Sequence, residues 1–174
     1  MWEIGDSEGT IGQKLSAIAD LASRARQYEP ETDERGAILL TLVETAKDGT
    51  HWQVSQAAFG ALEQIGDMSV CPALLGIFKD AGNPSMVRSN AALTLGRLGY
   101  LEAMEDLDAI RREGKEPQTV QNSAFHALKT LMRLQTRDEI HDTNITSRPP
   151  ASLGRTSPNP IVVRNGNLFL TQKT

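Results

Sequence analysis

Three similar stretches of this chain align without gaps: VSQAAFGALEQIG at residues 54–66, VRSNAALTLGRLG at 87–99 and VQNSAFHALKTLM at 120–132. Each copy begins 33 residues after the one before it. In the first copy, apolar residues stand at Val54, Ala58, Leu62 and Ile65, and the other copies repeat this spacing. The spacing places them on one face of an α-helix. The repeat therefore predicts three equivalent amphipathic helices, in which the small alanine lets a neighbouring helix approach closely.

A second apolar pattern follows the first two copies. It consists of Cys71, Leu74 and Ile77, and it recurs 33 residues later as Met104, Leu107 and Ile110. Gly66 and Gly99 end the helices before it, where a left-handed residue commonly closes a helix. The unit is therefore a helix, a tight turn, a second helix and a short loop. We expect helices over residues 10–28, 32–47, 50–66, 69–81, 84–98, 101–113 and 117–137.

These units predict an all-α protein, a short α-solenoid of antiparallel helical hairpins with a 33-residue period and an extended C-terminal tail. One hairpin of this size cannot bury its own apolar face, so neighbouring copies stack into a continuous core. We expect a helical repeat domain over residues 1–137, a flexible Pro/Ser-rich linker over 138–160, and a β-hairpin or partner-binding tail over 161–174.

The predicted stack ends without a closing repeat. It consists of three hairpins and a last helix, carrying Ala124, Phe125 and Leu128, that has no second helix after it. One face of this helix should stay uncovered unless something caps it, and the tail is the nearest candidate. Self-association through the uncapped helix is a further alternative.

The repeat resembles the HEAT repeat, and more narrowly the short HEAT-like repeats of phycobilisome lyases and of many bacterial adaptor proteins. The residues that carry the resemblance are Trp52, Val54, Ala58, Leu62, Gly66 and Asp67 in one copy, and Pro84, Val87, Arg88, Ala91, Leu95 and Gly99 in the next. Asp80 and Arg88 are similar to the family's Asp and Arg positions, whereas Ser55 and Gln121 stand where the other copies would repeat the Arg. The resemblance implies a stack of helices whose exposed layers bind other proteins.

The second helices of the second and third hairpins suggest partner-binding residues. Leu75 and Phe78 are replaced in the next copy by Asp108 and Arg111. One interpretation is an apolar spot beside a charged spot that also includes Arg112, as recognition surfaces have. The alternative is that the earlier hairpin, which is flanked on both sides, simply buries more of its surface.

The tail is a second candidate for contact with a partner. Residues 142–160 are rich in Ser, Thr, Asn, Pro and Gly, which is typical of an extended connector. Asn165-Gly166 then separates two β-favouring triplets, a pattern that predicts a hairpin. An isolated hairpin is marginal in water, so this segment either folds back on the last helix or binds a partner. The candidate tail residues are Arg148, Arg155, Ile161, Val162, Val163, Leu168, Phe169 and Leu170.

Charge is distributed unevenly along the chain. Residues 143–174 carry four basic residues and no acidic one, so the net charge of −4 for the whole chain leaves −8 on residues 1–142. An acidic body argues against general nucleic-acid binding, which requires a concentrated positive surface. The chain has no apolar run of membrane-spanning length and no signal-peptide pattern at its start. Together with the single Cys71, these features lead us to expect a cytoplasmic protein.

The sequence carries no pattern typical of catalysis or of cofactor binding. His51, His126 and His141 are far apart, and none belongs to a His-Glu pair of the kind that iron-binding HEAT hydroxylases use. A phosphate-cradling loop and a recognisable Ser or Cys nucleophile motif are both missing from the sequence. We therefore expect no catalytic, metal-binding or cofactor-binding residues, and no enzyme activity.

The hypothesis that the sequence favours is a non-catalytic protein-protein interaction module, an adaptor or structural subunit of a larger multi-subunit complex. The family resemblance supplies the first alternative, a bilin lyase-like subunit or a chaperone for a chromophore protein. A nucleic-acid-binding HEAT protein is the second alternative, and the negative charge of the body speaks against it.

Overall fold

The computed structural model describes residues 10–146, and every regular element within them is a helix. The seven α-helices of this part are α1 (Ile11–Ala25), α2 (Asp33–Asp48), α3 (Trp52–Ile65), α4 (Cys71–Lys79), α5 (Ser85–Leu98), α6 (Met104–Glu113) and α7 (Gln118–Thr146). Short 3-10 turns, η1 (Met68–Val70) and η2 (Leu101–Ala103), lead into α4 and α6. This confirms the all-α class, and the helices begin and end within a few residues of the predicted limits except at the end of α7.

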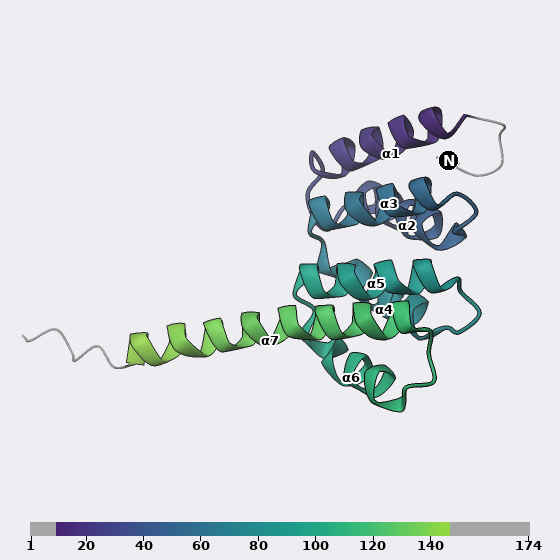
Figure 1. Cartoon of the computed structure of the whole chain (residues 1–174). Coiled ribbons are helices and arrows are strands. Elements are labelled where there is room, and N and C mark those ends of the chain that lie inside the picture. The colour runs from purple at the N-terminus through teal and green to yellow at the C-terminus, as the bar shows by residue number, and fades with distance from the viewer. Residues whose placement is uncertain (1–9, 147–174) are drawn as a thin grey trace, which may run out of the picture. The chain divides into compact units, whose positions relative to one another are not determined.

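The helices form two layers, as an α-solenoid requires (Figure 1). In one layer α1 packs against α3 and α3 against α5, while α2 contacts α4 in the other. The compact helical body ends at Glu139, close to the predicted limit of 137. The predicted solenoid of stacked helical pairs is confirmed.

The pairing of the helices differs from the predicted hairpins in its phase. The most extensive contacts join α2 to α3 and α4 to α5, so each 33-residue unit begins with the helix that we expected to come second. A repeat period gives the length of a unit but not the point at which it starts. Side-chain bonds to backbone carbonyls reinforce the observed pairs: the Ser55 hydroxyl donates to the carbonyl of Ala46 at 2.6 Å, and Arg88 Nε donates to that of Phe78 at 2.9 Å.

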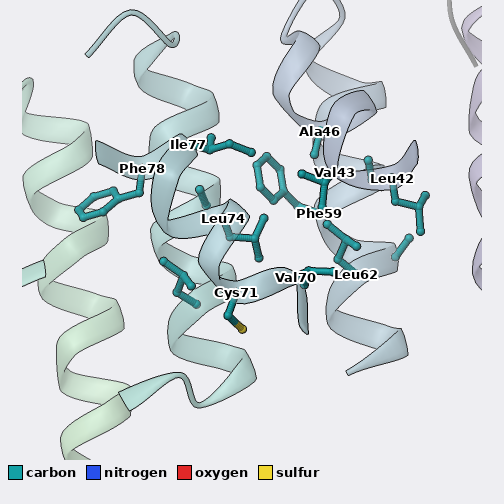
Figure 2. Packing of buried hydrophobic residues seen from close by; sticks show 14 of the residues in the cluster. Leu42, Val43, Ala46, Phe59, Leu62, Val70, Cys71, Leu74, Ile77 and Phe78 are labelled. Atoms are coloured by element: carbon teal, nitrogen blue, oxygen red, sulfur yellow. The ribbon is translucent and has the colours of Figure 1, made fainter. Parts of the chain in front are cut away.

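The recurring apolar positions form the core. The three central alanines, Ala58, Ala91 and Ala124, have no exposed surface at all. Figure 2 shows how one pair is covered by the next: the ring of Phe59 in α3 lies between Val43 of α2 and Ile77 of α4. This position of the helix that carries the central alanine is therefore buried by the helix pair that follows it along the stack.

The position that ends the first two copies explains where the chain turns. Gly66 and Gly99 follow α3 and α5 with left-handed φ angles of 70° and 79°, which a side chain would disfavour. Met132 occupies the same position in the third copy, so α7 continues past it to Thr146.

The prediction that a flexible linker begins at residue 138 was therefore wrong for residues 138–146, which are helical. The sequence contains no Gly or Pro between Pro117 and Pro149, and nothing in it stops the helix earlier. The remainder of the predicted linker and the predicted β-hairpin over 161–174 lie outside the described residues.

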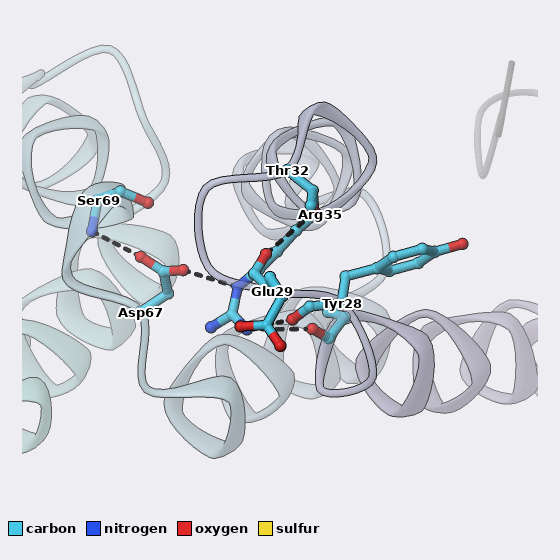
Figure 3. Close-up of polar contacts among 7 residues, drawn as sticks. Tyr28, Glu29, Thr32, Arg35, Asp67 and Ser69 are labelled. Carbon is cyan, nitrogen blue, oxygen red and sulfur yellow. Dashed lines mark hydrogen bonds and ion pairs between the residues drawn. The ribbon is translucent and has the colours of Figure 1, made fainter.

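A half-buried arginine ties α2 to the elements on both sides of it (Figure 3). Arg35 Nε donates to Asp67 Oδ2 at 2.9 Å, and its Nη1 donates to the carbonyls of Ala25, the last residue of α1, and Tyr28. Asp67 also accepts the backbone N–H of Ser69 at 3.0 Å. Burial alone would raise the pKa of Asp67, but the hydrogen bonds from Ser69 and Arg35 outweigh it and lower the pKa below its ordinary value.

The contact between α5 and α7 depends on a glycine. A Cβ atom added to Gly96 would lie 2.8 Å from the Cα of Ala127, closer than two such atoms can approach. Gly60, which lies in α3, has no neighbour within 4 Å of the same added atom. Of these two helical glycines, Gly96 is therefore the one that close helix packing requires.

We expect Gly96→Ala to lower the free energy of unfolding by about 1–3 kcal/mol, because the backbone of α7 must move away from α5. The matched control Gly60→Ala should instead raise it by up to about 1 kcal/mol, because alanine is the better helix former and meets no neighbour. Urea unfolding followed by circular dichroism measures both. Equal effects of the two substitutions would contradict the close approach at Gly96.

Candidate protein-binding groove

An apolar groove with a volume of about 540 Å³ runs along α7 beside the end of α6. Its lining residues are Arg111, Phe125, Leu128, Lys129, Met132, Arg133 and Thr136. All but Arg111 belong to α7, where their spacing of three and four residues places them in one stripe along the helix. We call this surface the α7 groove.

The α7 groove is open because no helix pair follows α7 in the described stack. Phe125 is 49% exposed and Met132 is 55% exposed. The residues equivalent to Phe125 in the earlier copies, Phe59 and Ala92, are 2% and 0% exposed. The same type of position is thus core in two copies and surface in the third. This confirms the predicted uncovered face of the last helix within the described residues.

The charges that line the groove are all positive. Lys129 and Arg133 lie on α7 and are exposed, and Arg111 reaches the groove from α6. Asp108 binds Arg111 at 2.7 Å and Arg112 at 2.5 Å, so one carboxylate balances two guanidinium groups there. No acidic residue lines the groove. It is an apolar strip with a cationic border, set on a body that is acidic in total.

An ion pair between a buried arginine and a half-buried glutamate positions the start of α7. Arg88 of α5 is 2% exposed, and its Nη1 donates to Glu116 Oε2 at 2.5 Å, two residues before α7 begins. Gln121 of α7 donates to the backbone carbonyl of Glu116 at 2.6 Å. The hydrogen bond from Arg88 lowers the pKa of Glu116 below its ordinary value. Asp80, the residue similar to the family's Asp position, accepts the N–H of Gly82 instead.

The structure divides the predicted partner-binding residues into three groups. Phe78 is completely buried, so the predicted apolar spot of Leu75 and Phe78 is wrong for Phe78, and Leu75 is half-buried. The alternative interpretation holds there, because α4 is flanked on both sides. Asp108, Arg111 and Arg112 do form one cluster on α6, of which Arg111 borders the groove. The candidates Arg148, Arg155, Ile161, Val162, Val163, Leu168, Phe169 and Leu170 lie outside the described residues.

Four groove residues were missed by the sequence analysis: Lys129, Met132, Arg133 and Thr136. The signal for them was present, because they extend the helical stripe of Phe125 and Leu128 at the same spacing. Met132 stands in place of the helix-ending glycine of the earlier copies, which indicates that the helix and its stripe continue.

Other features of the described residues offer less to a ligand. A second hollow of about 190 Å³ lies between α3 and α5, but its main charged group, Glu63, already binds Thr94 and Arg97. Cys71 is buried, which raises the pKa of its thiol to about 11, with a further contribution from Glu102 and Asp67. Within residues 10–146 no group of three or more His, Cys, Asp or Glu side chains could hold a metal ion. None of the helices described there has the length and apolarity to cross a membrane.

The family profile described as HEAT repeats matches residues 39–129, just over half of the chain, and the chain therefore belongs to the HEAT-repeat family. Among solved structures it is similar to human deoxyhypusine hydroxylase in complex with glycerol, with 21% sequence identity and a TM-score of 0.50. The similarity covers 75% of this chain but 49% of that one, so this chain spans about half the enzyme's length. At this identity the likeness shows the fold alone. The comparison with curated protein sequences finds no match.

Acid should weaken the fold through Asp67 and Glu116. Because folding lowers both pKa values, the folded chain binds fewer protons than the unfolded chain in acid, and the free energy of unfolding should fall as the pH drops below about 4.5. Glu116→Gln should lower the free energy of unfolding by about 1–3 kcal/mol at neutral pH, because Arg88 loses its charged partner. On acidification, the free energy of unfolding of this variant should fall less than that of the unaltered chain. Urea unfolding at a series of pH values measures both effects.

The control for this experiment is Glu105→Gln. Glu105 is exposed and its carboxylate makes no ion pair or hydrogen bond within the described residues. The free energy of unfolding of the Glu105→Gln chain should depend on pH in the same way as that of the unaltered chain. A Glu116→Gln chain with the same pH dependence as the control would contradict the role of the Arg88–Glu116 pair.

Proposed function

We propose that this chain is a non-catalytic protein-binding module, an adaptor or structural subunit of a larger assembly, and that its partner docks on the α7 groove. HEAT repeats commonly serve protein interaction and scaffolding, which agrees with this proposal at the level of the family. The observation that carries it is the exposure of Phe125 and Met132 in a stripe whose equivalents are core elsewhere in the same chain.

The groove has the composition of an interface centre. It joins an aromatic ring, a methionine and arginines, residue types that are enriched where proteins bind one another. The ring of Phe125 also meets that of the exposed His126 edge to face at a centroid distance of 5.8 Å, so the aromatic surface extends beyond the groove residues themselves.

The groove also lies on the part of α7 that packs against α5. Arg88 bonds to the loop before the helix, and Gly96 lets α5 approach α7 closely at Ala127, next to the groove residues Phe125 and Leu128. A surface held in this way is suited to recognising one partner geometry rather than adapting to many.

The experiment is affinity purification of the tagged chain from an extract of its source organism. Phe125→Glu combined with Met132→Glu should abolish co-purification of the partner, because two charges would enter the apolar strip. Both side chains are about half exposed, so the fold should tolerate the changes.

The matched control is Leu40→Glu, which places a charge on an apolar side chain of α2 that is 62% exposed and lies outside the groove. The control should retain the partner. The proposal is contradicted if the groove variant keeps the same partners as the unaltered chain, or if bilin transfer activity or nucleic acid accompanies the chain independently of the groove.

A further inference from the structure

We infer that the segment that fills the α7 groove is an amphipathic helix of another protein, with acidic residues on both sides of its apolar stripe. This inference rests on the proposed function, and it adds the conformation and charge of the partner segment.

The earlier copies show what covers such a surface. Phe59, the equivalent of Phe125, is covered by the helix α4 of the next pair, whose Leu74 and Ile77 face it with exposures of 0% and 5% (Figure 2). The same chain thus supplies a template in which a helix with apolar residues three apart covers this stripe. A partner helix in the corresponding place beside α7, which no described helix occupies, would bury Phe125, Leu128 and Met132 in the same manner.

The positive side chains at the border of the groove favour a partner helix with negative charge. Lys129 and Arg133 carry positive charge that no acidic residue lining the groove balances, whereas Arg111 is already paired with Asp108. A helix with acidic flanks would pair with Lys129 and Arg133, whereas one with basic flanks would meet like charge.

The chain's own tail fits this border poorly. Residues 147–174 contain Arg148, Arg155, Arg164 and Lys173 and no acidic residue. Their Ile161-Val162-Val163 triplet is apolar enough to enter the groove, but four positive charges would accompany it. Charge therefore disfavours the tail as the occupant.

A second copy of the chain fits poorly as well. In a two-fold dimer the same surface meets itself, so Lys129 and Arg133 of one protomer would face the same residues of its partner. Like charges placed opposite each other in an interface oppose association.

The test uses the full chain and two fluorescein-labelled peptides of about 16 residues, long enough for four helical turns. Both carry leucine at positions i, i+3, i+4 and i+7; one has glutamate and the other lysine at the flanking positions. Glutamate and lysine have similar helix propensities, so charge is the main difference between them. By fluorescence anisotropy at low salt, the glutamate peptide should bind on the order of tenfold more tightly, and added salt should reduce the difference.

Charge reversal in the protein completes the test. Lys129→Glu with Arg133→Glu, both on exposed side chains, should invert the preference between the peptides, whereas Lys47→Glu, an exposed residue of α2, should leave it unchanged. Circular dichroism should show the same helicity in all variants.

Three results would overturn the inference. One is equal or tighter binding of the lysine peptide to the unaltered chain. The second is that deletion of residues 147–174 strengthens binding of the glutamate peptide about tenfold, which would identify the tail as the occupant. The third is an oligomer, seen by sedimentation, that Phe125→Glu dissociates. If affinity purification still shows a groove-dependent partner in any of these cases, the proposed function stands and only the chemistry assigned to the partner helix fails.

Discussion

Each helix pair in this chain has an apolar stripe that the following pair covers, and this constraint determines both the core and the candidate site. Phe59 and Ala92 are core because α4 and α6 with their partners come after them along the stack. Phe125 has the same place in the repeat, and no described pair comes after it. The apolar groove is therefore the repeat's own packing surface, exposed at the position where the described repeats end.

A few polar side chains form directional hydrogen bonds between neighbouring helices, and these bonds fix the position of one helix along the other more closely than apolar packing does. Ser55 and Arg88 occupy one repeat position and both donate to a carbonyl near the end of the preceding helix, and Gln121 donates to the carbonyl of Glu116. The carbonyls of Ala46 and Phe78 lie in the last turn of their helices and have no partner there, so these two bonds satisfy groups that would otherwise remain unpaired. Arg88 extends this function, since its bond to Glu116 also holds the loop before α7. Arg35 and Asp67 serve the same purpose nearer the N-terminus.

Sequence periodicity was sufficient to predict the helices, because the apolar positions of an amphipathic helix must recur at its own period. It did not reveal which helices pair most closely, since the contacts of α2 with α3 are set by side-chain shape and by bonds such as that of Ser55. Phe78 was misassigned for a related reason: an apolar residue on a second helix is exposed or buried according to its neighbours in space, and the sequence does not contain them. The groove was partly predicted, through the uncovered face with Phe125 and Leu128. Lys129 and Arg133 were missed because their significance depends on α7 continuing as a helix beside Arg111.

The central claim, that the stripe on α7 stays open in the whole chain, can be tested by thiol labelling. Phe125→Cys places a thiol in the groove, and Ala92→Cys places one at the equivalent buried position of α5. The native Cys71 is buried with its pKa raised to about 11, so it should contribute no fast reaction. With a chromogenic disulfide reagent at neutral pH, the thiol at position 125 should react roughly a hundredfold or more faster than the one at position 92, which reacts only when the structure opens. Equally slow reaction at both positions would show that the stripe is covered in the whole chain, and would contradict the account.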